Sequence, residues 1–144
     1  PYQTREDRMQ PRRLARLCFA ASLLFPAAAA NAACLQSDLG GTWQAYTLSI
    51  KGGNTYWARC KLVINGSTGA IANTNCFTAF GYTALTQGKA TLANAANCTF
   101  TAQYKIAGVL NTLVHGTLSK DKEVGQGVGT LPSFGQFTLN MTKL

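Results

Sequence analysis

The amino-acid sequence predicts an all-β domain, folded as a single small antiparallel up-and-down β-barrel of about eight strands, with a β-sandwich as the alternative. Three observations predict this class. Short segments alternate apolar and polar residues, tight turns rich in Gly and Asn separate them, and no window after residue 32 shows the apolar period of a helix. The barrel is favoured because short connections join neighbouring strands and because closure removes exposed strand edges.

The first 32 residues have the features of an export signal. Met9 begins a stretch that contains three arginines, and an apolar run over residues 17–30 ends at an A-x-A cleavage pattern. We therefore expect residues 1–8 to be upstream sequence without a structural role and residues 9–32 to be a signal peptide. Residues 33–144 are expected to form the barrel.

Other forms of membrane attachment fit the sequence less well. The apolar run is shorter than a typical transmembrane helix, so we expect no membrane span in the mature chain. Lipid attachment at Cys34 is disfavoured because Asn31 stands where lipid attachment signals carry an aliphatic residue. The style of the signal is bacterial, so the predicted location is the periplasm or the medium.

The composition of residues 33–144 argues against several classes of function. This part of the chain has eight Lys and Arg side chains and three carboxylates, a net charge of +5. The basic residues are scattered and are not interleaved with aromatic residues, so nucleic-acid binding is not expected. Glycoside hydrolysis needs two carboxylates that face each other across a cleft, and His115 has no nucleophile elbow near it. We expect neither catalysis nor a bound cofactor.

The four cysteines after residue 32 predict two disulfides, because exported chains of this size commonly use an even number of cysteines in this way. Zinc binding is disfavoured, since there is no C-x-x-C pair and only one His, and no metal site is expected. If the Asn-Gly-Ser-Thr-Gly turn closes a hairpin centred on Thr68, Cys60 and Cys76 lie directly opposite, within reach of a disulfide. The predicted bridges are Cys60–Cys76 and, by elimination, Cys34–Cys98.

The expected strands share β-branched and aromatic residues, and most alternate between apolar and polar positions. They cover residues 43–50, 56–64, 70–80 with a polar interruption at 73–75, 82–86, 89–93, 98–106, 109–119, 125–131 and 134–143. The Gln87-Gly88 pair is expected to separate two strands. The glycines of residues 125–129 are expected to allow a bulge or a barrel corner.

The start of the predicted barrel resembles a known group of proteins. Residues 38–43 read D-L-G-G-T-W, which resembles the G-x-W signature that opens the first strand of calycin barrels, the group that contains lipocalins. The segment is most similar to that of small secreted bacterial inhibitors of serralysin-type metalloproteases, which reads D-L-A-G-x-W. In that family a Cys in the second strand pairs with a later Cys, and Cys60 and Cys76 are similar. The resemblance implies a barrel whose end is marked by Gly41 and Trp43, with Trp43 as an apolar plug.

Two functions are compatible with such a barrel, whose interior is either filled by side chains or holds one small ligand. The favoured one is an exported binding protein for a small apolar ligand, like a lipocalin. The alternative is a periplasmic or secreted protease inhibitor acting through protein–protein contact, although only residues 33–37 precede the shared motif here. In either case we expect a monomer. The candidate interior or ligand-facing residues are Tyr46, Tyr56, Phe100, Tyr104 and Phe137.

Overall fold

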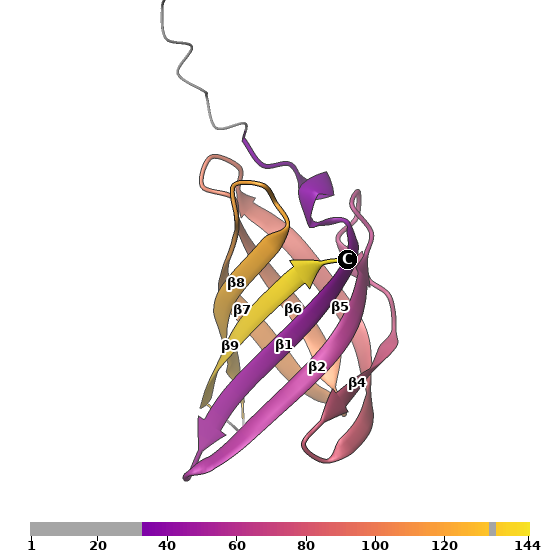
Figure 1. Cartoon of the computed structure of the whole chain (residues 1–144), viewed down its shortest axis with the longest axis vertical. Coiled ribbons are helices and arrows are strands. Elements are labelled where there is room, and N and C mark those ends of the chain that lie inside the picture. The colour runs from indigo at the N-terminus through magenta and orange to yellow at the C-terminus, as the bar shows by residue number, and fades with distance from the viewer. Residues whose placement is uncertain (1–32, 133–134) are drawn as a thin grey trace, which may run out of the picture. The chain divides into compact units, whose positions relative to one another are not determined.

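A computed structural model of the protein describes residues 33–132 and 135–144 (Figure 1). The predicted signal peptide lies outside the described residues. The described chain contains one short 3-10 helix and nine strands: η1 (Gln36–Leu39), β1 (Gly41–Lys51), β2 (Asn54–Ile64), β3 (Ala70–Ile71), β4 (Thr74–Thr78), β5 (Gly81–Asn94), β6 (Thr99–Ile106), β7 (Val109–Leu118), β8 (Val124–Leu131) and β9 (Gly135–Lys143).

The strands form a closed antiparallel barrel, which confirms the predicted fold class. Each strand from β5 to β9 pairs with the next, β9 pairs with β1, and β1 pairs with β2. The short strands β3 and β4 together fill the remaining position between β2 and β5, so the barrel has eight positions. Among the described residues, no helix is long and apolar enough to cross a membrane.

Both predicted disulfides are present. Cys60 of β2 lies opposite Cys76 of β4, with Cα atoms 4.4 Å apart, and the Cα atoms of Cys34 and Cys98 are 5.1 Å apart. The pairing changes register by one residue between Ile64 and Cys60, which the sequence did not indicate. Ile64 pairs with Ile71, and the chain then leaves the ladder at residues 72–73, ahead of the interruption expected at 73–75.

The predicted break at Gln87-Gly88 is wrong, because β5 continues through it as one long strand. The pairing of β5 with β6 shifts register between Thr86 and Lys89, and Gln87 has a left-handed φ of 53°. These features describe a β-bulge, which bends a strand without ending it. Gly88 also has to be small, since a Cβ at that position would lie 2.6 Å from Cβ of Ile71.

The glycines of β8 lie beside a bulge, as expected, and also have a second role. They stay in regular register with β9, but the pairing of β7 with β8 shifts register between Leu113 and His115, opposite Gly129 and Val128. The glycines also leave space for large core side chains: a Cβ at Gly129 would overlap the ring of Phe137, and one at Gly125 would overlap Met141. Gly116 of β7 leaves room for the Phe100 ring in the same way. The interior is therefore filled by aromatic and Met side chains lying over glycines of a neighbouring strand.

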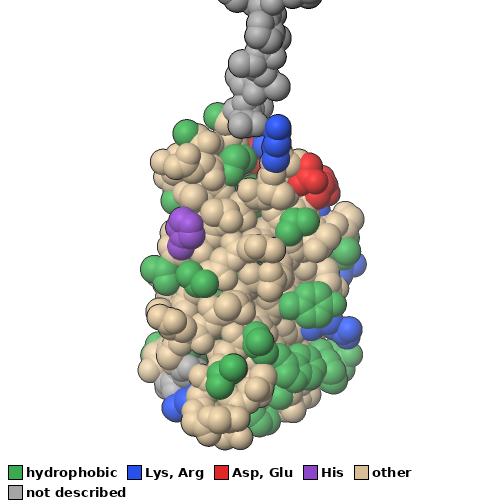
Figure 2. All heavy atoms as spheres, turned by 60° about the vertical axis from the view of Figure 1, so that its left-hand side comes forward, with side chains coloured by type: hydrophobic (Ala, Val, Ile, Leu, Met, Phe, Trp, Pro, Cys, Tyr) green, Lys and Arg blue, Asp and Glu red, His purple; other side chains and the backbone are tan. Residues whose placement is uncertain are grey.

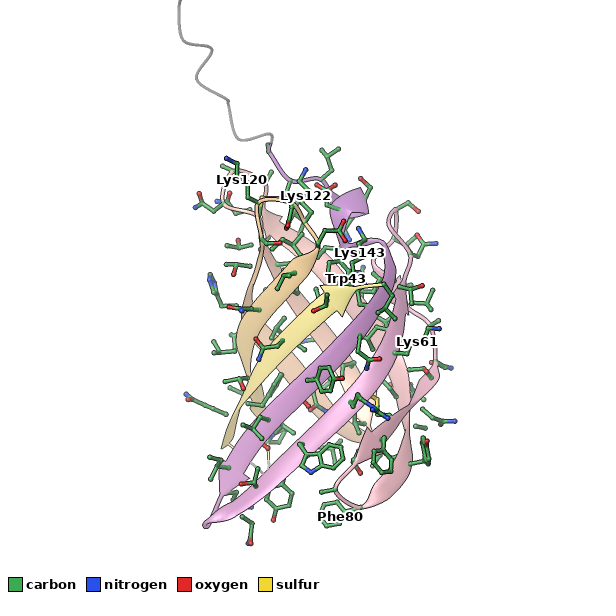
Figure 3. All side chains as sticks on the ribbon, viewed as in Figure 1. Trp43, Lys61, Phe80, Lys120, Lys122 and Lys143 are labelled. Carbon is green, nitrogen blue, oxygen red and sulfur yellow. A yellow bond between two sulfur atoms is a disulfide. The ribbon has the colours of Figure 1, made fainter. Side chains whose placement is uncertain are left out.

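One end of the barrel, called here the closed end, is covered by η1 and the segment before it (Figure 3). Leu39 and Trp43 are fully buried there, and the indole Nε1–H of Trp43 donates to the carbonyl oxygen of Leu39 at 2.9 Å. Lys143 Nζ lies 5.2 Å from the Trp43 ring centroid, on which it forms a cation–π contact. The disulfide to Cys98 holds Cys34, and with it the start of the described chain, at this end.

Candidate functional site

The opposite end of the barrel, called here the open end, contains a pocket of about 330 Å³. It lies where the β1–β2, β4–β5 and β6–β7 hairpins meet the adjoining ends of β8 and β9, at the lower end in Figure 1. Its volume falls at the lower end of the range of about 300–1,000 Å³ that is typical of small-molecule sites. None of its lining residues is charged.

The lining of the pocket is mostly apolar, and aromatic at its rim. Tyr56 comes from the start of β2 and Phe80 from the β4–β5 turn, while Trp57 and Tyr82 border the pocket from outward-facing positions of β2 and β5. The Tyr56 and Phe80 rings lie 5.9 Å apart, so the rim side chains also contact one another. The wall is completed by Phe137, buried below the rim, and by three aliphatic residues: Ile106, Val109 and Leu131.

The barrel interior below the pocket is packed. A residual space of about 30 Å³ remains there, lined by core residues such as Leu85, Phe100 and Met141. A ligand is therefore limited to the open end, because the middle of the barrel has no room for it. The sequence left open whether the barrel interior is filled or hollow. In the structure the middle of the barrel is filled by side chains, and the open end is hollow.

A few neutral polar groups lie at the base of the pocket. Ser49 and Asn111 are the buried polar residues of the described chain, and both line the pocket. Asn111 Nδ2 donates to the carbonyl oxygen of Val109 at 2.8 Å, which fixes the amide in place. Below them, the buried Tyr104 hydroxyl has no hydrogen-bond partner among the described residues, and its ring packs edge-on against Phe137. Burial raises the pKa of Tyr104, so this phenol is neutral at physiological pH.

The predicted interior residues are only partly brought together. Phe100, Tyr104 and Phe137 are buried in the barrel, and Tyr56 is half-buried at the pocket rim. Tyr46 was wrongly expected inside: it lies on the outer face and is 51% exposed. The period of two along β1 explains the difference, because the buried Trp43 places odd-numbered residues inside and therefore Tyr46 outside.

Several pocket residues were missed by the sequence reasoning, above all Trp57, Phe80 and Tyr82. Trp57 and Tyr82 occupy strand positions close to a turn, and Phe80 lies in the turn itself. An aromatic residue in a tight turn, such as Phe80, buries little surface within its own hairpin. Its position in a turn could therefore have indicated a contact with a ligand or with another hairpin. The contribution of separate hairpins to one rim depends on barrel closure, which local patterns do not encode.

The carboxylates of the described chain lie at the closed end, far from the pocket along the barrel. Asp38 of η1 pairs with Lys122 of the β7–β8 turn at 3.0 Å and accepts the Leu35 N–H at 2.7 Å. The Leu35 hydrogen bond, followed by the contacts with Lys122, lowers the pKa of Asp38 below its usual value. In the same turn Asp121 accepts hydrogen bonds from the Ser119 hydroxyl and the Glu123 N–H.

These carboxylate contacts stabilise the structure of the closed end. Lys122 links η1 to the β7–β8 turn, and Asp121 holds the turn itself. Within residues 33–132 and 135–144, no group of three His, Cys, Asp or Glu side chains is placed to hold a metal ion. The pocket at the open end is therefore the candidate functional site.

Comparison with protein-family models and with curated protein sequences gives no significant match. The resemblance of residues 38–43 to the calycin signature thus stays a prediction. The evidence for the barrel fold is the strand pairing described above.

Proposed function

We propose that the protein is an exported, non-enzymatic binding protein that holds a small apolar ligand in the open end of its barrel. The observation that carries the proposal is the uncharged pocket of about 330 Å³ between the open-end hairpins. Burial of apolar ligand surface against Tyr56, Phe80 and Phe137 supplies the affinity, at roughly 25 cal/mol per Å² removed from water. Ser49 and Asn111 supply a small number of directed hydrogen bonds to a neutral polar group of the ligand.

Export is supported by the disulfides. Two bridges, one in a hairpin and one at the closed end, are typical of proteins that fold in an oxidising compartment. Together with the predicted signal peptide, they favour the periplasm or the medium as the location.

The alternative of a protease inhibitor has less support. Insertion into a protease cleft needs a free N-terminal tail, as in the inhibitors that the sequence resembles. Here the Cys34 N–H donates to the carbonyl oxygen of Ala95, and the Cys34 side chain is bonded to Cys98. Any tail that acts in this way would have to precede Cys34.

The test is a titration with N-phenyl-1-naphthylamine, a small apolar probe that fluoresces strongly only away from water. We expect a saturable rise in fluorescence with the wild type. Ala58→Phe should reduce binding because Ala58 is buried on the pocket wall and an added ring fills the space. Ala79→Phe, in the rim turn, should reduce it without disturbing the core.

The matched control is Ala84→Phe, which adds the same ring on the exposed outer face of β5. Circular dichroism checks that each variant is folded. Absence of saturable binding to the wild type would contradict the proposal, as would equal binding by all three variants.

A further inference from the structure

The hairpins around the pocket present apolar side chains to solvent. Ile50, at the end of β1, is 66% exposed, and Phe80 is 83% exposed. Phe80 lies in the β4–β5 turn, at the lower end of the barrel in Figure 3. Leu110, next to the β6–β7 turn, is also exposed. These three residues come from three different hairpins, so they surround the mouth instead of forming a patch on one side of the barrel.

An outward-facing row of three aromatic side chains and one arginine lies behind these tips. Tyr46, Arg59, Phe77 and Tyr82 are consecutive register partners across β1, β2, β4 and β5. Tyr82 is 78% exposed, its ring lies 5.1 Å from Phe77, and the Arg59 guanidinium lies 5.9 Å from the Phe77 ring centroid. In Figure 2 the largest group of adjacent hydrophobic side chains on the visible face lies at its lower right, and smaller ones are scattered over the rest of the face.

Basic side chains occur along the whole barrel, whereas the described acidic side chains lie at the closed end. Arg59 of β2 and Lys105, at the end of β6, lie in the open half. The described chain has no carboxylate side chain there, because Asp38 lies in η1 and Asp121 and Glu123 lie in the β7–β8 turn at the closed end. Among residues 33–132 and 135–144, no acidic side chain therefore lies in the same half as Arg59 and Lys105.

From these features we infer that the open end of the barrel docks on an anionic lipid surface. Apolar tips enter the boundary between headgroups and acyl chains, as the apolar faces of interfacial proteins do. Tyr and Trp side chains are favoured at the headgroup level, which is where the row behind the tips then lies. Arg59 and Lys105 contact lipid phosphates, and each basic residue near an anionic surface adds to the attraction.

A bilayer fits these features better than a protein partner of limited area. The exposed tips encircle the mouth, and a flat, deformable surface contacts all of them at once. The row of Tyr46, Arg59, Phe77 and Tyr82 occupies one side, so the barrel leans on β1, β2, β4 and β5. In this orientation the pocket opens onto the bilayer, and an apolar ligand passes between the two without crossing water. Docking on a lipid surface is a property additional to ligand binding in the pocket, and the two are tested separately.

The test is flotation of the purified, exported protein with vesicles of phosphatidylcholine alone or mixed with phosphatidylglycerol, at low and high salt. We expect binding to the anionic vesicles that weakens as salt screens the charges. Arg59→Gln and Lys105→Gln each remove one positive charge, and each should weaken binding to the anionic vesicles about fivefold. Phe80→Ser, which removes an exposed tip, should weaken it about tenfold.

Matched controls lie outside the proposed contact. Val114→Ser removes an aliphatic side chain that is 55% exposed on the outer face of β7, and Lys120→Gln removes an exposed charge at the closed end. Both should bind as the wild type does. All proteins share one N-terminus, which mass spectrometry checks, so differences between them report on the barrel.

Three results would overturn the inference. These are absence of binding to anionic vesicles, equal loss in control and open-end variants, and lipid-free self-association that Phe80→Ser abolishes. The last result would mean that a second copy of the chain covers the open end. Binding of the naphthylamine probe without vesicles is measured in parallel, so failure of docking and failure of the pocket are distinguishable.

Discussion

Removal of the disulfides one at a time should destabilise the barrel by amounts set by the chain length that each one closes. Cys34 and Cys98 are separated by 64 residues, and Cys60 and Cys76 by 16. The chain-entropy relation then gives losses of about 4.3 kcal/mol for the first bridge and about 3.1 kcal/mol for the second. Since small domains are stable by about 5–15 kcal/mol, loss of both bridges approaches the total free energy of unfolding.

The assay is urea unfolding followed by circular dichroism. The variants are Cys34→Ala with Cys98→Ala, and Cys60→Ala with Cys76→Ala, because alanine leaves no thiol to re-pair. We expect the first pair to lose more stability than the second, by about 1 kcal/mol. Excess reductant should lower the melting temperature of the wild type.

Two results would refute this reasoning. One is a larger loss in the Cys60 and Cys76 variant, because it would mean that local contacts outweigh loop closure. The other is a melting temperature that reductant leaves unchanged.

The variant without Cys34 and Cys98 also tests the division of the barrel into two ends. Its pocket lies at the other end from the missing bridge, so it should still bind the naphthylamine probe under conditions where it is folded.

Two further predictions concern the core and the closed end. Gly116→Ala should cost about 1–3 kcal/mol by overpacking, since its Cβ would lie 2.6 Å from Cζ of Phe100. Adding Phe100→Leu should recover part of this loss in urea unfolding, and strictly additive losses would contradict the proposed contact. Asp38→Asn should lower stability at neutral pH and match the wild type in strong acid. The pKa of Asp38 is lowered in the fold, so its stabilisation is present above the ordinary value of 3.8 and is lost as pH falls through the folded value. Acid unfolding curves of the two proteins that stay separated at the lowest pH would contradict this assignment.

Much of the fold could be predicted from the sequence, because its main determinants are local. Alternation along residues 98–106 and 134–143 marks half-buried strands, and the pairing of Cys60 with Cys76 was predicted correctly, although the irregularity at residues 72–73 was not. The errors have physical causes. The bulge at Gln87 was mistaken for a strand end, because both carry a turn-like Gly. The β8 glycines were expected to allow a bulge, which is present in the pairing with β7, but their second role, making room for Phe137 and Met141 on the neighbouring strand, was not foreseen.

The candidate site was less accessible to sequence reasoning. Phe137 was identified because it follows the period of its strand, and Tyr56 because it begins one. Trp57, Phe80 and Asn111 were not, since their convergence requires the closed barrel. The sequence also did not indicate that the core is packed while the mouth is hollow. That difference depends on which glycines face which aromatic rings.

The most direct test of the ligand-binding proposal uses the two tryptophans as reporters of position. Trp57 lines the pocket, whereas Trp43 is buried at the closed end. Trp43→Phe leaves Trp57 as the reporter, and Trp57→Phe leaves Trp43. With the naphthylamine probe bound, we expect strong energy transfer from Trp57 in the first variant and much weaker transfer from Trp43 in the second. Equal transfer in both variants, or transfer from Trp43 alone, would contradict binding at the open end.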